Sequence, residues 1–143
     1  MKHKNSISQT YIKRDKEAIP KLFRRAKEIA EYPTTTKRLF EIVADLPTQQ
    51  FYVADDAAMS YIRKRVMHGE HKKFRNPYKQ RLFDALYEEV ISMLKEEKYK
   101  AMGLKNTVIC ALSRPAPCIG LTPFVIFRLY VRNRKTNEQN FQT

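Results

Sequence analysis

Basic side chains gather in two windows of the sequence, and their chemistry suits contact with phosphate. Residues 57–83 hold eight lysines and arginines and one acid, Glu70, for a net charge of +7 in 27 residues. Residues 114–135 hold five basic residues and no acid. Dense lysine and arginine concentrate polyanions and release counterions on meeting phosphates. This distribution predicts a nucleic-acid-binding protein with an accessory or regulatory role.

The predicted phosphate contacts lie at the C-terminal ends of two expected helices and in the loop after the first. They are Arg63, Lys64, Arg65, Lys72, Lys73, Arg75, Arg128, Arg132 and Arg134. Arginine adds a planar fork that fits phosphate oxygens and guanine edges. DNA is the partner expected over RNA. Tyrosines among these charges, Tyr61, Tyr78 and Tyr130, are expected to stack on bases or sugars.

Other reactive side chains do not form a recognisable catalytic or metal-binding set. His68 and His71 flank Glu70, but two histidines do not complete a metal site. The pairs Glu88–Glu89 and Glu96–Glu97 are adjacent in sequence, so their members do not share a helix face as an acid and a base would. The sequence therefore predicts no catalytic residue, no metal ligand and no cofactor, and a binding protein rather than an enzyme.

Length and composition limit the fold. The chain has 143 residues, a net charge of +13, 43% hydrophobic residues and only 3 glycines. It is long enough for one domain with a core, and the scarcity of glycine disfavours a β-sandwich or barrel. No apolar run approaches the roughly 20 residues that span a bilayer. Two cysteines, Cys110 and Cys118, are too few for a secreted disulfide scaffold. We therefore expect a cytoplasmic protein without a membrane span.

Hydrophobic periodicity predicts an all-α protein of about six helices. The expected helices are 16–32, 36–46, 56–67, 77–100, 104–113 and 123–134, and Pro20 moves the start of the first toward Ile19. Asp55 is a predicted N-cap, and Asn76-Pro77 and Thr122-Pro123 are start signals of a cap followed by proline. Residues 1–14 are expected to form a basic flexible arm, residues 15–135 a single domain, and residues 136–143 a polar tail.

An internal duplication is one interpretation of the sequence. A shift of 68 residues aligns residues 37–65 with the second half, so that Pro47 meets Pro115 and Ala58 meets Ile126. The aligned order is helix, proline, extended step and capped helix, which suggests two similar three-helix units at 15–68 and 76–135. The other interpretation is that any two amphipathic helix pairs align in this way.

The same order of elements is loosely similar to a helix-turn-helix unit. Residues 55–65 and 122–132 would be the recognition helices, entering major grooves of DNA. The connector at residues 46–54 is longer than the usual turn of about three or four residues. In a second interpretation, loops and tails hold the phosphate backbone and the helices only position them.

Two segments carry a resemblance to a group of proteins. They are L-P-T-Q-Q-F-Y-V-A-D-D-A-A at residues 46–58 and R-P-A-P-C-I-G-L-T-P at residues 114–123. These segments are similar to those of small, basic bacterial proteins that carry P-A-P-x-F-Y-L-T-P-like sequences. The resemblance covers about half of the chain. It implies a common fold and assigns no functional residue, because the group has no established activity.

Two alternatives to nucleic-acid binding remain open. In the first, the protein is an adaptor for an acidic protein partner, anchored by exposed aromatics among Phe51, Tyr52, Phe124 and Phe127, which otherwise belong to the core. In the second, a basic amphipathic helix lies on a membrane surface. Nucleic-acid binding predicts that the two basic windows form one continuous surface, whereas an adaptor predicts an exposed apolar patch. The sequence does not determine the target sequence, the choice between DNA and RNA, the oligomeric state or the pathway.

Overall fold

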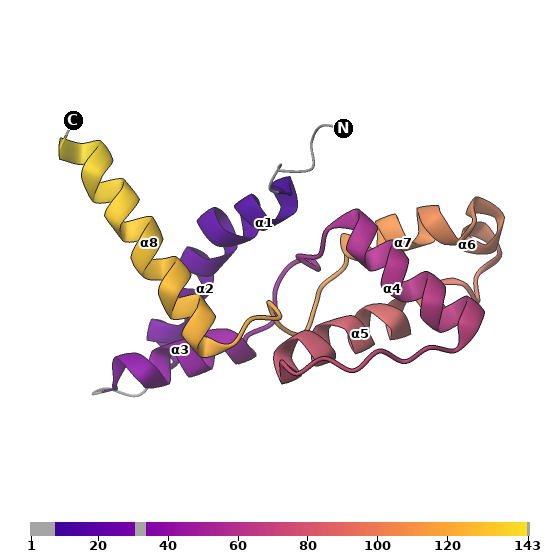
Figure 1. Ribbon diagram of the computed structural model, residues 1–143, viewed down its shortest axis with the longest axis horizontal. Helices are drawn as coiled ribbons and strands as arrows, with labels where there is room; N and C mark the ends of the chain where they lie inside the picture. Colours follow the sequence, from indigo (N-terminus) through magenta and orange to yellow (C-terminus); the bar gives the residue numbers. More distant parts are fainter. Residues whose placement is uncertain (1–7, 31–33, 143) are drawn as a thin grey trace.

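The computed structural model describes residues 8–30 and 34–142, with side chains described as far as Asn133 (Figure 1). Within these ranges the protein is all-helical and has no strand, which confirms the predicted fold class. The elements are α1 (Gln9–Lys13), η2 (Arg14–Ala18), α2 (Ile19–Ile29), α3 (Thr36–Asp45), α4 (Asp55–His68), α5 (Pro77–Met93), α6 (Glu97–Met102), α7 (Leu104–Leu112) and α8 (Pro123–Gln142).

The first three elements follow one another without a break, and η2 is a turn of π-helix. The Ile19 N–H donates to the Arg14 carbonyl, five residues back, rather than to the Asp15 carbonyl. In the same pattern the Asp15 carbonyl would face Pro20, which has no N–H to give. Helix formation begins at Gln9 after the Ser8 cap, so residues 9–14 of the expected flexible arm are helical. Residues 1–7 of that arm lie outside the described chain.

Two of the predicted start signals, Asn76 and Thr122, act as caps in the structure, and Thr35 caps α3 in the same way. The side chains of Thr35, Asn76 and Thr122 accept hydrogen bonds from the backbone at the starts of α3, α5 and α8. These bonds satisfy N–H groups that have no partner inside the helix. The predicted cap at Asp55 is wrong: the N-cap of α4 is Ala54, and Asp55 lies in the first turn, where its charge complements the helix dipole.

The helix predicted for residues 77–100 is two helices in the structure. α5 ends at Met93, and α6 begins at Glu97 and ends before Gly103, whose φ of 91° suits glycine. The break allows Tyr99 to turn into the core, where it is buried. Neither glycine nor proline marks residues 94–96, so local sequence gave no signal for it. At the other end, α8 continues to Gln142, through most of the segment expected to be a polar tail.

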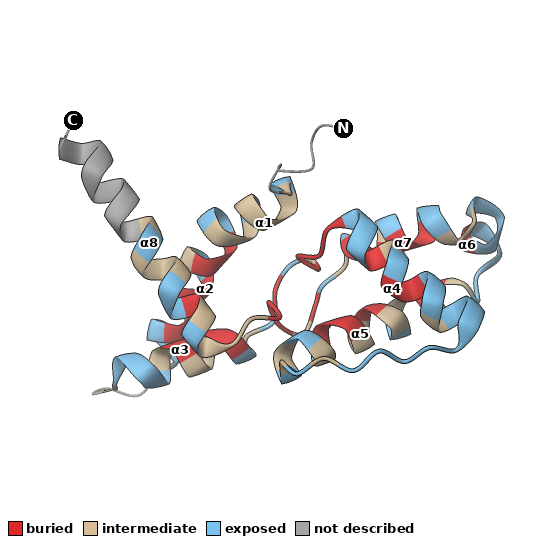
Figure 2. Cartoon of the chain, in the orientation of Figure 1, coloured by how far each residue is buried: buried red, intermediate tan, exposed pale blue. Residues whose placement is uncertain are grey.

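Buried side chains form two clusters, one in each helix group (Figure 2). The first group comprises α2, α3 and α8, with η2 packed against them. The second comprises α4, α5, α6 and α7. Two extended connectors, residues 46–54 and 113–122, run between the groups (Figure 1). The clusters meet at these connectors: Phe51 is buried in the second cluster, and its neighbour Tyr52 is buried in the first.

The connectors pair with each other at one point. The backbones of Thr48 and Ala116 exchange two hydrogen bonds of 3.0 Å as an isolated antiparallel bridge. These residues are 68 positions apart in the sequence, as are the helix caps Ser8 and Asn76. That separation equals the shift that aligns the two sequence halves. The duplication stays a prediction, and these positions agree with its register.

The connectors also decide which helices pack together. α3 packs on α8, and α4 packs on α7, so each connector carries the chain away from the helix before it. The pairs α3–α4 and α7–α8, which the sequence suggested as helix-turn-helix units, are therefore divided between the two groups. The helix-turn-helix expectation is corrected: the connector is extended and crosses between groups, and it does not fold α4 back on α3.

Candidate nucleic-acid interface

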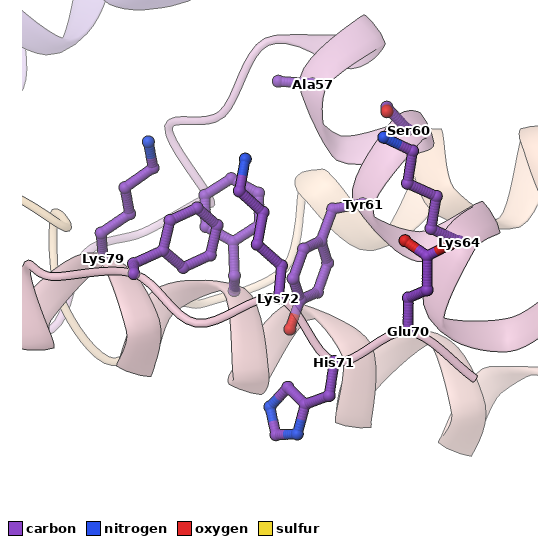
Figure 3. A pocket seen from close by; sticks show the side chains of 10 residues that line it. Ala57, Ser60, Tyr61, Lys64, Glu70, His71, Lys72 and Lys79 are labelled. Carbon is purple, nitrogen blue, oxygen red and sulfur yellow. The ribbon is translucent and has the colours of Figure 1, made fainter. Parts of the chain in front are cut away.

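A pocket lies between α4, the loop after it and the start of α5 (Figure 3). Its volume is about 610 Å³. The lining residues are Ala57, Ser60, Tyr61, Lys64, Glu70, His71, Lys72, Phe74, Lys79 and Phe83. All of them belong to the first basic window, so the pocket combines three lysines and three aromatic rings with a single acid.

Three aromatic rings line the pocket and pack on one another. The Phe74 ring lies 5.0 Å from that of Phe83 and 5.9 Å from that of Tyr61, measured between centroids. Tyr61 meets Phe83 edge to face at 4.9 Å. Because Tyr61 and Phe83 belong to the core cluster, they hold Phe74 as the outermost, partly buried member of the trio.

Two lysine ammonium groups lie over the outermost ring. The Nζ atoms of Lys79 and Lys72 are 4.7 Å and 5.3 Å from the centroid of the Phe74 ring. Figure 3 shows these lysines extending the same way from the loop and from α5, whereas His71 points away from them. Such cation–π contacts are worth about 0.5–1 kcal/mol at exposed sites. Positive charge and an aromatic surface therefore occupy the same pocket.

The loop that carries Lys72 and Phe74 is fastened by one glutamine. The backbone N–H of Phe74 donates to Oε1 of Gln80 at 2.7 Å, and Nε2 of Gln80 lies 3.5 Å from the carbonyl oxygen of Lys72. The same Nε2 atom donates to Oδ1 of Asp84 at 3.1 Å. One side chain of α5 thus holds the loop at the backbone of Lys72 and of Phe74.

Asp84 is the polar centre beneath this site. Its Oδ1 atom accepts from Nη1 of Arg65 at 2.9 Å and from the Tyr61 hydroxyl at 3.3 Å, and Nε2 of His71 lies 3.2 Å away. Burial acts to raise the pKa of the Asp84 carboxyl, but hydrogen bonds from Gln80, Arg65 and His71 outweigh it and hold the pKa below its usual value. The carboxylate therefore ties α4, the loop and α5 together.

Arg65 serves this internal network. Its guanidinium donates to the Tyr61 hydroxyl at 2.8 Å and to Asp84, and it stacks on the Tyr87 ring with Cζ 3.8 Å from the centroid. Only 16% of its side chain is exposed. Among the predicted phosphate contacts of the first window, Arg65 is the one that the structure turns inward.

Six other cations of the first window face solvent. They are Arg63, Lys64, Lys72, Lys73, Arg75 and Lys79, and none of them has an ion-pair partner among the described side chains. Lys79 was not among the predicted contacts. Arg81, by contrast, lies 3.4 Å from Asp45. The first window thus carries six exposed cations without a described ion-pair partner, and three of them, Lys64, Lys72 and Lys79, line the aromatic pocket.

The second basic window lies elsewhere. Arg128 and Arg132 are exposed on α8, which packs in the first helix group, whereas the pocket belongs to the second group. In Figure 1 the two regions lie toward opposite ends of the molecule. The side chain of Arg134 lies outside the described residues. The structure therefore places Arg128 and Arg132 on a different helix group from the pocket, whereas Arg114 of the same window pairs with Glu89 of α5.

The three tyrosines expected to stack on bases pack inside the protein instead, and Tyr78 is partly buried against both clusters. Tyr61 is buried, and Tyr130 packs against Phe23 and Phe40 in the first cluster. The outermost of the three aromatic residues that line the pocket is Phe74, which the sequence does not single out because its neighbours are polar and basic. An aromatic residue inside a basic loop was the available signal. Its packing partners, Tyr61 and Phe83, come from two different helices.

The described residues hold neither a cluster of metal-binding side chains nor a membrane-spanning helix. His71 is engaged with Asp84, and the described residues contain no cluster of three or more histidine, cysteine, aspartate or glutamate side chains arranged to hold a metal ion. None of the described helices has the length and apolar character needed to cross a bilayer.

A second, apolar groove lies between α3 and the start of α8. Phe124 and Phe127 border it with exposed fractions of 66% and 42%, and Phe40 and Pro123 complete the apolar lining. Of the four aromatics considered as partner anchors, Phe51 and Tyr52 are core residues, whereas Phe124 and Phe127 face solvent.

Comparison with protein families, with curated proteins and with solved structures finds no match to this chain. A functional assignment therefore rests on the chemistry of the sites described above.

Proposed function

We propose that the protein binds nucleic acid, with DNA favoured over RNA, in a non-enzymatic, accessory or regulatory role. One observation carries this proposal: six exposed cations of the first basic window have no ion-pair partner among the described side chains, and three of them, Lys64, Lys72 and Lys79, line the aromatic pocket. A charge excess of this kind is costly to leave unneutralised on a small patch, and a polyanion neutralises it with release of counterions. A cytoplasmic location, expected from the sequence, belongs to the same proposal.

Within this proposal the basic residues have two roles. Arg63, Lys64, Lys72, Lys73, Arg75 and Lys79 contact phosphates from α4, from the loop and from α5. Arg65 is a positioning residue, because it holds Tyr61 and Asp84 and leaves little of its side chain exposed. Arg128, Arg132 and Arg134 on α8 form a separate, secondary contact with the same polyanion.

Fluorescence anisotropy across a salt series tests the proposal. The probe is a labelled random DNA duplex, with an RNA of the same sequence and a single DNA strand as comparisons. We expect log K to fall linearly with log salt, with a slope of about −5 for six phosphate contacts. The variant Lys64→Gln/Lys72→Gln/Lys79→Gln is expected to lose about three contacts and to reduce the slope accordingly.

A matched control separates the patch from net charge. Lys16→Gln/Lys21→Gln/Lys105→Gln removes the same charge from exposed lysines outside the pocket. It should leave the affinity close to that of the unchanged protein. Equal losses in the two triple variants would show that only the total charge matters, and absence of binding at low salt would reject nucleic-acid binding.

The alternative function, an adaptor for an acidic protein, is favoured by the groove at Phe124 and Phe127. Lys37 lines this groove, and the guanidinium of Arg128 lies 5.7 Å from the Phe124 ring centroid, although Glu41 also lines it. A labelled acidic amphipathic peptide tests this alternative. Binding that is lost in Phe124→Ser/Phe127→Ser, and retained in the triple lysine variant of the pocket, would support the adaptor function.

A further inference from the structure

We infer that the pocket between α4 and α5 takes an unpaired nucleotide of a DNA strand, with its base stacked on Phe74 and its phosphates on Lys64, Lys72 and Lys79. This inference rests on the proposed nucleic-acid binding and specifies the kind of nucleic acid that the site selects.

The aromatic part of the site supports an unpaired base. A partly buried phenylalanine between two exposed lysines is an unusual place for an apolar ring, and Tyr61 and Phe83 hold it there from behind. Bases stack on such rings with little regard to sequence, because every base has a π face. In a duplex both faces of each base are covered by its neighbours, so a ring in a pocket does not reach them without base extrusion.

The positions of the charges fit the same ligand. The ammonium groups of Lys72 and Lys79 lie over the ring, within 5.3 Å of its centroid, so a base that stacks on Phe74 displaces these exposed groups toward its own phosphates, and Lys64 lines the pocket from α4. In a nucleotide the phosphate is one sugar away from the base, so a base on Phe74 brings its phosphates to these cations. The volume of about 610 Å³ lies within the range of about 300–1,000 Å³ that is usual for small-ligand pockets.

The fixed geometry of the loop makes stacking effective. Gln80 binds the backbone N–H of Phe74 and lies against the carbonyl of Lys72, and Asp84 fixes Gln80 and Tyr61. The ring is therefore ordered before the strand arrives, and less conformational entropy is lost on binding. A loop that only attracted phosphates through its lysines would not need this support.

A tryptophan placed at the site gives a direct readout. The chain has no tryptophan, so Phe74→Trp introduces a single fluorophore where the base is expected to stack. The probes are an oligothymidylate of about twelve nucleotides, within the usual site sizes of single-strand binders, an abasic strand of equal length and a duplex. We expect strong quenching by oligothymidylate and little by the other two.

Two further variants complete the test. Ile29→Trp places the fluorophore on an exposed site of α2, in the other helix group and outside both basic windows, and should not be quenched by oligothymidylate. Phe74→Leu keeps an apolar side chain but removes the π face, and it should weaken oligothymidylate binding about tenfold, with the salt slope and the abasic-strand affinity unchanged. Circular dichroism and urea unfolding verify that each variant is folded.

The outcomes separate this inference from the proposed function. Equal quenching by the abasic strand, or equal weakening of both strands by Phe74→Leu, would overturn base stacking. If the triple lysine variant reduces affinity while Phe74 variants do not, the patch binds the phosphate backbone alone. If neither kind of variant affects binding to any of these probes, the proposed function fails as well.

Discussion

The side-chain amide of Asn133 donates a hydrogen bond of 2.7 Å to the backbone carbonyl of Asp15, across 118 positions of the chain. That carbonyl has no helical donor, because Ile19 donates to Arg14 and Pro20 lacks an N–H. A side chain from α8 therefore satisfies the backbone group that the π-turn leaves unpaired, and it fastens α8 to the first helix.

Asn133→Leu should destabilise the protein by about 1–3 kcal/mol, the cost of leaving a partly buried carbonyl unsatisfied. Urea unfolding followed by circular dichroism measures the change. Asn106→Leu is the matched control, since Asn106 donates to an exposed carbonyl of Met102 that water can satisfy. In a Pro20→Ala background, residue 20 regains an N–H, and Asn133→Leu should cost less there. An equal cost in both backgrounds would contradict this account of the π-turn.

Asp84 makes stability depend on acid pH. Its pKa is held below the usual value in the folded protein, so ionised Asp84 stabilises the fold above the carboxyl pKa of the unfolded chain, about 4. That contribution is lost as the pH falls through the lowered pKa. The difference in Tm between the unchanged protein and Asp84→Asn should be largest near pH 7 and should shrink in acid. A difference that stays constant from neutral to acid pH would argue against this role.

Arg63 and Arg65 are two positions apart on α4, and their substitutions should have different effects. Arg63 is exposed without an ion-pair partner in the described chain, so Arg63→Ala should reduce the salt slope of DNA binding by about one and leave stability unchanged. Arg65→Ala removes the cation bound to Asp84 and should destabilise the fold by about 1.5–3 kcal/mol. Anisotropy and urea unfolding of both variants measure the two effects. The reverse pattern would place Arg65 on the phosphate.

The secondary structure was largely predictable because its signals are local. The cap of Asn76, the proline after it and the apolar spacing of α5 each act within a few residues, and they correctly mark where that helix begins. The packing was not predictable in the same way. Whether α4 folds back on α3 or crosses to α7 depends on the path of residues 46–54. Pro47 and the short apolar run at residues 51–53 do not specify that path.

In the candidate site, too, the features set by local composition were predictable and those set by packing between helices were not. Charge density identified the first basic window, because composition alone measures it. The inward turn of Arg65 depends on Asp84 and Tyr87, which lie on another helix, and the accessibility of Phe74 depends on Tyr61 and Phe83. Contacts of this kind between elements are set by packing, so spacing along the chain did not separate the structural arginine from its exposed neighbours.

Gly120 tests how closely the second connector is held against α5. A Cβ atom at this position would lie 2.6 Å from Cδ2 of the buried Leu82. The φ of Gly120, 83°, disfavours any residue with a side chain. Its carbonyl also accepts from Nδ2 of Asn76, the residue that caps α5. Gly120→Ala should therefore incur both backbone strain and a steric clash in the core.

Gly69→Ala is the control for that variant, because Gly69 has a similar positive φ of 67° but open space around its Cα. We expect Gly69→Ala to cost about 1–2 kcal/mol from strain alone, and Gly120→Ala to cost more, since overpacking adds about 1–3 kcal/mol. Urea unfolding of both variants gives the comparison. Equal costs would mean that Leu82 moves aside freely, and that the connector is not tightly packed on the helix that carries the candidate site.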